Sequence, residues 1–80
     1  MSSDPEVNGI LEDIDIGIEM VDDIEVCHPH TWERGEDFLS DVRDKLRSVR
    51  ATIEDRDFVT ERQSNAVANW IEGIERWCPD

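Results

Sequence analysis

The first thirty residues of this 80-residue chain contain no lysine and no arginine. Nine carboxylates occupy that stretch, so it carries −9 of the chain's formal charge of −13. The other fifty residues hold the remaining 12 of the 21 acids and all eight bases, a net of −4. Because phosphates repel such a chain, its charge argues against direct binding of DNA, RNA or an anionic membrane. The same charge favours a basic protein surface as the partner.

A long apolar run and a secretory signal are both missing. No stretch approaches the roughly 20 apolar residues that a membrane span needs, so we expect no membrane association. The start, Met1-Ser2-Ser3-Asp4, lacks the basic residues and the apolar core of a signal peptide. We therefore expect a cytoplasmic protein whose two cysteines, Cys27 and Cys78, are reduced thiols.

Motifs for catalysis are missing as well. The four glycines are isolated from one another, so none forms a phosphate-binding loop. Cys27 and His28 are neighbours in sequence, but adjacency is not the geometry of a nucleophile and its base. In a chain with 21 acids, any spacing between two carboxylates occurs by chance. We expect neither an enzyme nor a cofactor.

One stretch, Cys27-His28-Pro29-His30, is dense in metal-ligand types. Cys78 could add a ligand if the C-terminus returns to this stretch, which gives Cys27, His30 (or His28) and Cys78 as a weak candidate zinc set. The chain has no second pair with zinc spacing. A Cys27–Cys78 disulfide, or ordinary loop and terminal residues, are the alternatives.

The last third of the chain has the clearest helical pattern. Thr60-Glu61-Arg62-Gln63 matches a capping box, with Thr60 as the N-cap and Gln63 reaching back to it. Pro79 marks the stop. We expect a helix from Glu61 to Trp77, with one stripe at three- and four-residue spacing. That stripe consists of Gln63, Val67, Trp70, Ile71, Ile74 and Trp77.

The middle of the chain predicts a second helix, from Trp32 to Ile53, with Thr31 as its N-cap. Its expected core residues share one face. They are Phe38, Leu39, Val42, Leu46, Val49 and Ile53.

The first segment is ambiguous between helix and strand. Asp4-Pro5 is typical of an N-cap followed by proline in the first helical position. A helical stripe follows, made of Val7, Ile10, Leu11, Ile14, Ile18 and Val21. Residues 14–20, however, alternate as a strand does. Because the rest of the chain offers a strand no partner, we favour an acidic amphipathic helix over residues 5–26.

These elements predict one all-α domain over residues 1–80, a small three-helix up-down-up bundle. Residues 32–77 form its αα-hairpin, and the N-terminal segment is β only in the alternative reading. A chain this short is marginally stable alone, so a homodimer, a disulfide or a metal would each be a natural support.

The helical reading also predicts a binding face on the first segment. Ile16 and Met20 fall outside the core stripe and among carboxylates, as an apolar anchor with a charged rim. We expect Ile16 and Met20 to anchor a partner, in contact with six carboxylates around them. These are Glu12, Asp13, Asp15, Glu19, Asp22 and Asp23.

Residues 32–77 resemble a helical-hairpin module of small bacteriophage and prophage proteins, which reads W-E-x-x-F-L and then [ST]-x-[KR]-Q. The matching residues are Trp32-Glu33, Phe38-Leu39, Val42, Leu46, Val59 to Gln63, and Ala66. Here two residues are inserted before Phe38, and the link between the helices is longer. The resemblance implies an αα-hairpin and a phage origin, hence the host cytosol, but no catalytic residues.

Two functional hypotheses follow. In the first, a small acidic phage-type protein binds another protein as a nucleic-acid mimic. It would inhibit a DNA- or RNA-binding host defence complex, as anti-CRISPR inhibitors do. In the second, the chain is a non-catalytic accessory or structural subunit of a phage replication, recombination or packaging complex, and is a homodimer.

Overall fold

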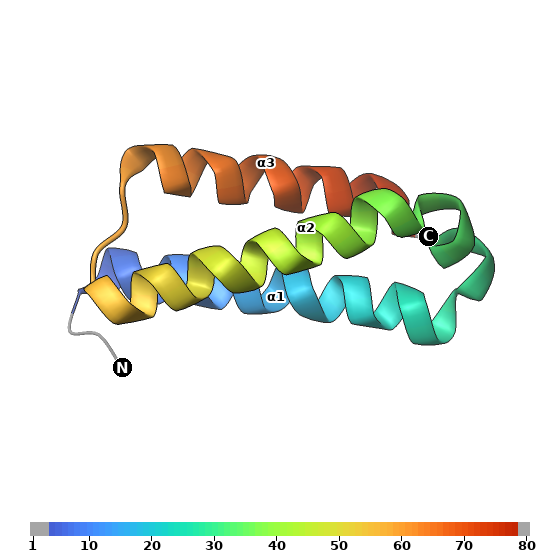
Figure 1. Cartoon of the computed structure of the whole chain (residues 1–80), viewed down its shortest axis with the longest axis horizontal. Helices are drawn as coiled ribbons and strands as arrows, with labels where there is room; N and C mark the ends of the chain where they lie inside the picture. The colour runs from blue at the N-terminus through green and yellow to red at the C-terminus, as the bar shows by residue number, and fades with distance from the viewer. Residues whose placement is uncertain (1–3, 79–80) are drawn as a thin grey trace.

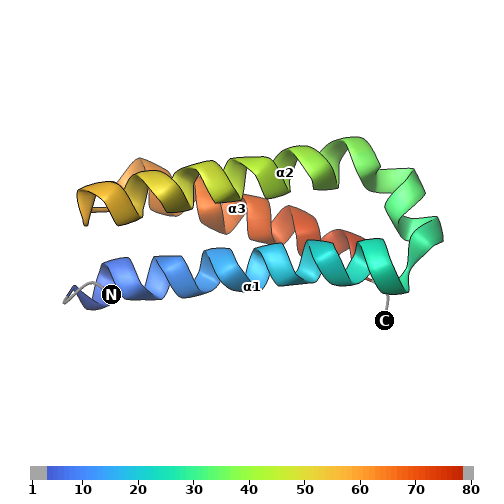
Figure 2. The same ribbon diagram turned by 60° about the horizontal axis from the view of Figure 1, so that its bottom comes forward.

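The computed structural model describes residues 4–78, which form three α-helices. They are α1 (Pro5–Cys27), α2 (Pro29–Arg56) and α3 (Glu61–Trp77), and they run up, down and up along a body of 40 × 19 × 19 Å (Figure 1). Figure 2 shows the long antiparallel pair α1 and α2, with α3 behind them and between them in this view. The expected all-α three-helix bundle is confirmed, and the strand alternative for the first segment is wrong.

Helix α1 begins as its sequence predicts. The Asp4 side chain accepts a 2.9 Å hydrogen bond from the backbone N–H of Glu6, and Pro5 occupies the first turn. The helix continues through the alternating residues 14–20 and ends at Cys27, one residue beyond the expected range. The helical period prevails because it turns Val7, Ile14 and Val21 toward two other helices at once.

A single residue, His28, connects α1 to α2. Its backbone N–H donates to the carbonyl of Ile24, and its own carbonyl accepts from Trp32. The expected start at Trp32, with Thr31 as N-cap, is therefore wrong. Proline suits the first helical position because its fixed φ matches a helix and its missing N–H is not needed there. The helix consequently starts at Pro29, and no side chain caps it.

Helix α2 also extends beyond the expected Ile53, to Arg56. It ends where Asp57 adopts a left-handed conformation, with φ of 54°, and donates its N–H to the Ile53 carbonyl. Helix α3 has the predicted bounds. Gln63 accepts from the Thr60 N–H at 2.9 Å and donates its own N–H to the Thr60 hydroxyl at 3.0 Å. The stop expected at Pro79 lies outside the described residues.

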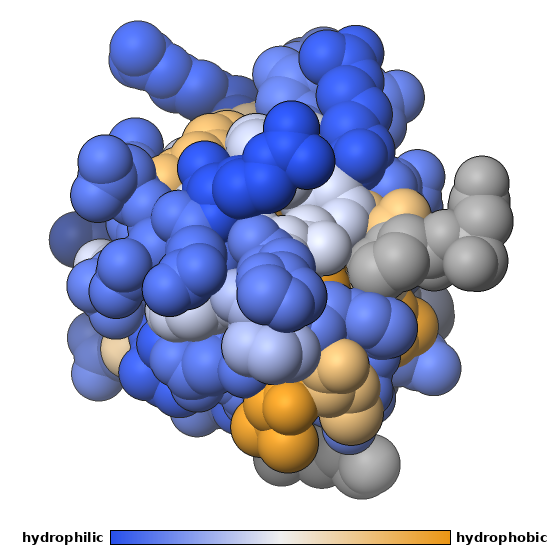
Figure 3. Space-filling model, turned by 90° about the vertical axis from the view of Figure 1, so that its right-hand side faces the viewer, coloured by the Kyte–Doolittle hydropathy of each residue, from blue (hydrophilic) through white to orange (hydrophobic). Residues whose placement is uncertain are grey.

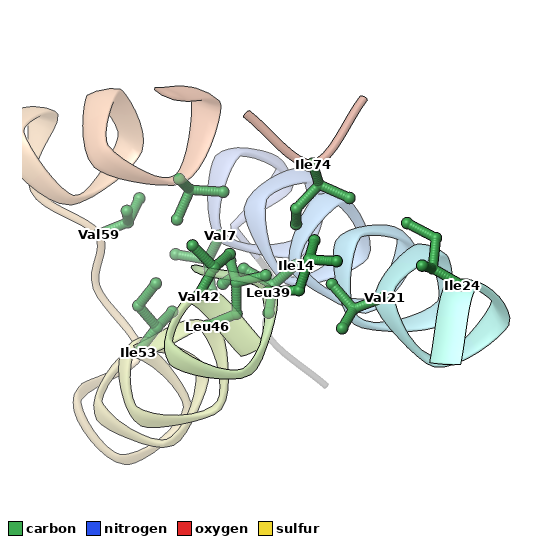
Figure 4. Close-up of a cluster of buried hydrophobic side chains, with 11 residues drawn as sticks. Val7, Ile14, Val21, Ile24, Leu39, Val42, Leu46, Ile53, Val59 and Ile74 are labelled. Atoms are coloured by element: carbon green, nitrogen blue, oxygen red, sulfur yellow. The ribbon is translucent and has the colours of Figure 1, made fainter. Parts of the chain in front are cut away.

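The core runs along the axis between the three helices, and its side chains point toward one another (Figure 4). Seven-residue intervals recur in each helix, which is the spacing of packed, supercoiled helices. Full burial of each such side chain stabilises the fold by roughly 1.5–3 kcal/mol. The buried residues are Val7, Ile14, Val21, Ile24, Leu39, Val42, Leu46, Ile53, Val59, Val67 and Ile74.

Two residues depart from their expected places. Phe38, expected in the core, is 38% exposed, and its ring covers Gly73 at the edge of the α2–α3 contact. Met20, expected outside the core stripe, is half-buried and packs against the core.

None of the helices in residues 4–78 combines the length and apolar character needed to cross a bilayer.

Candidate acidic interaction face

The residues predicted to contact a partner all lie on α1 and spread around its outward side. We call them the acidic face. Glu12, Asp13, Ile16, Glu19 and Asp23 are exposed, and Asp15, Met20 and Asp22 are half-buried. They therefore divide into an open outer part and a part that lies against neighbouring helices.

The edge of the acidic face next to α2 is held by ion pairs. Arg50 of α2 contacts Asp15 at 3.0 Å and Glu54 of its own helix at 3.0 Å. This cluster borders a groove between α1 and α2 with a volume of about 780 Å³. Asp15 thus helps to fix α1 against α2, and its charge is compensated within the molecule.

Arg43 of α2 makes the more buried connection, to the last two turns of α1. Its guanidinium contacts Asp22 at 2.7 Å and Glu25 at 3.3 Å, and lies 5.2 Å from the Trp32 ring centroid. Only 15% of the Arg43 side chain is exposed. The hydrogen bond to Glu25, supported by the one to Asp22, raises the Arg43 pKa despite the opposing effect of burial. Arg43 therefore stays charged and screens both carboxylates.

The outer part of the acidic face has no such compensation. Within residues 4–78, Glu12, Asp13, Glu19 and Asp23 form no ion pair. Ile16 lies among them and is 45% exposed, as the helical period predicts. A rigid helix thus presents four uncompensated carboxylates around one exposed apolar side chain.

The two cysteines lie at one end of the bundle, Cys27 as the last residue of α1 and Cys78 directly after α3. A hydrogen bond with Asp23 raises the pKa of the Cys27 thiol, and burial, with the charges of Glu75 and Asp23, raises the pKa of Cys78. A thiol attacks as a thiolate, so both shifts oppose nucleophilic attack. Both cysteines are free. In residues 4–78, no three His, Cys, Asp or Glu side chains are grouped to hold a metal, so Cys27, His30 and Cys78 form no such centre.

The sequence reasoning missed two features of this region. The first is that two arginines of α2 form ion pairs with α1, Arg43 with Asp22 and Arg50 with Asp15. The sequence contains a signal for these pairs, because the two aspartates are seven residues apart and so are the two arginines. The second is Val26, which is 77% exposed in the last turn of α1. Figure 3 views that end of the molecule, where hydrophilic side chains predominate and a small hydrophobic patch lies at the lower edge.

Comparison of the chain with protein-family models, with curated proteins and with solved structures finds no match. We therefore infer its function from the geometry and charge of the chain itself.

Proposed function

We propose that this protein acts by binding a basic protein surface through the acidic face of α1. In its sharpest form, the protein is a nucleic-acid mimic that inhibits a DNA- or RNA-binding host defence complex, in the manner of anti-CRISPR inhibitors. The observation that carries this proposal is the set of uncompensated carboxylates fixed on one helix. We propose no enzymatic activity.

The charge density of α1 supports mimicry. Six carboxylates lie between Glu12 and Asp23, a helical rise of about 16 Å, which gives one charge per ~3 Å. One strand of duplex DNA carries a charge every ~3.4 Å along the axis. Arg43 and Arg50 compensate two of the six, so the outer part alone presents one charge per ~5 Å. A groove that binds nucleic acid would therefore meet a comparable row of anions.

The setting that we propose is a bacteriophage or prophage, on the basis of the hairpin resemblance over residues 32–77. A mobile element gains from a small inhibitor that needs no cofactor and no catalytic step. The host cytosol is the compartment where such an inhibitor would meet a nuclease or surveillance complex.

A competition experiment tests the proposal. The partner would first be captured from the host with the full chain and identified, and its complex would then be titrated with the partner's own nucleic acid. We expect the nucleic acid to displace the protein, because both would occupy one basic groove. Simultaneous binding of both ligands at full affinity would rule out mimicry.

The second candidate, an accessory subunit acting as a homodimer, is favoured by the exposure of Val26 at 77% and Ile16 at 45%. Two acidic faces would repel each other, so a dimer would have to bury other surface as well. Sedimentation of the full chain separates the candidates. A dimer that dissociates on Ile16→Ser with Val26→Ser, but not on Asp15→Asn with Glu19→Gln, would support the accessory role.

A further inference from the structure

A pocket of about 390 Å³ opens within the acidic face, at its α3 edge, where α1 meets the end of α3. Figures 1 and 2 both place the end of α3 at the same end of the bundle as the last turns of α1. Ile16, Met20 and Ile24 supply apolar lining, and Glu19 and Asp23 supply carboxylates. His28 and Cys78 complete the lining. Neither lysine nor arginine is among the lining residues.

The opposite edge of α1 shows how this helix binds an arginine. There Arg50 lies between Asp15 of α1 and Glu54. One heptad away, Arg43 lies between Asp22 and Glu25, with its guanidinium over an aromatic ring. Along the α2 edge, the carboxylates of α1 thus meet guanidinium groups supplied by the chain itself.

Along the α3 edge, no arginine within residues 4–78 forms an ion pair with the carboxylates of α1. Helix α3 carries Arg62 and Arg76, and neither forms an ion pair within residues 4–78. Glu19 and Asp23 are one helical turn apart, so their side chains lie about 6 Å from each other at the Cβ atoms. That spacing suits a guanidinium group, whose planar fork can donate to both carboxylates.

We propose that this pocket receives an arginine side chain from a basic protein partner. The aliphatic stem lies over Ile16 and Met20, and the guanidinium lies between Glu19 and Asp23. Arginine fits better than lysine because its flat, weakly hydrated head combines bidentate hydrogen bonding with contact to apolar surface. The inference rests on the proposed function, since it names the side chain that the partner would insert into the acidic face.

The test uses the full chain and two labelled probes, an arginine–glycine repeat peptide and its lysine–glycine counterpart, at low salt. We expect the arginine peptide to bind more tightly and to shift the NMR signal of the Met20 methyl group. Glu19→Gln with Asp23→Asn should weaken arginine-peptide binding about tenfold, as expected for lost hydrogen bonds to charged groups. Ile16→Ser, at an exposed position that the fold does not need, should also weaken it although no charge changes.

The matched control is Glu12→Gln with Asp13→Asn, which removes two exposed charges from α1 outside the pocket. This control should weaken binding only about twofold to threefold. If both double variants weaken binding equally, the pocket is overturned while the acidic face remains a binding surface. If neither weakens it, the pocket and the proposed function both fail. Equal affinity for the two peptides would overturn the assignment to arginine.

Discussion

Two glycines of α1 provide a direct test of how this helix packs. A Cβ added at Gly9 would meet nothing within 4 Å. A Cβ added at Gly17 would lie 3.1 Å from Leu46 of α2 and 3.3 Å from Ile71 of α3. Gly9→Ala and Gly17→Ala therefore make the same chemical change in the same helix, one into open space and one into the core.

The expected magnitudes follow from two opposing effects. Alanine favours a helix interior over glycine by about 0.8–1.0 kcal/mol, and Gly9→Ala should gain that amount. Overpacking a dense core costs about 1–3 kcal/mol, and Leu46 is completely buried, so it has little room to move. Gly17→Ala should therefore range from nearly neutral to about 2 kcal/mol destabilising, which is ~1–3 kcal/mol below the Gly9 variant.

Urea unfolding, followed by helical ellipticity, measures both free energies. Because 1 kcal/mol shifts the Tm of a domain this size by about 4–8 °C, thermal melts give a second reading. Equal stabilisation by both substitutions would show that Gly17 does not contact α2 and α3. The three-helix packing described here, and with it the placement of the acidic face, would then be wrong.

Three further predictions concern caps, ion pairs and thiols. Arg43→Met should destabilise the fold by about 1–2 kcal/mol in urea unfolding, because it leaves Asp22 and Glu25 unscreened against each other. A stability equal to that of the wild type would mean that this ion pair is only incidental. Thr60→Ala should cost about 1 kcal/mol through the lost cap; a loss of less than a few tenths would argue against the capping box. Because its raised pKa leaves less thiolate at a given pH, Cys27 should alkylate more slowly near pH 8 than after Asp23→Asn, which lowers that pKa. Identical alkylation rates would contradict the Asp23 hydrogen bond.

Much of the fold could be predicted because local signals and burial agree. The capping box at Thr60 set the start of α3 correctly, and the stripe containing Val7, Ile14 and Val21 correctly favoured helix over strand. The start of α2 was misplaced because Thr31 is a typical N-cap residue, whereas the helix starts at Pro29, which suits the first helical position. Phe38 was wrongly placed in the core. Periodicity does not show that its ring packs over Gly73 at the edge of the α2–α3 contact, where it remains partly exposed.

The candidate face was predictable only in outline. Composition placed the carboxylates in the first segment, and the helical period correctly predicted that Ile16 is exposed. Which acids are compensated depends on the register of α1 against α2, which brings Asp15 to Arg50 and Asp22 to Arg43. That register is a tertiary property, and so is the pocket beside Met20, which forms only where the end of α3 reaches α1.

We propose that uncompensated carboxylates on α1 drive binding to a basic partner. The most direct measurement is the affinity of the full chain for its captured partner between about 50 and about 200 mM salt, a range that separates charge-driven from apolar contacts. We expect the affinity to fall at least about tenfold across this range, and Glu12→Gln with Glu19→Gln to flatten its dependence on salt. An affinity that does not change with salt would show that these carboxylates do not drive binding.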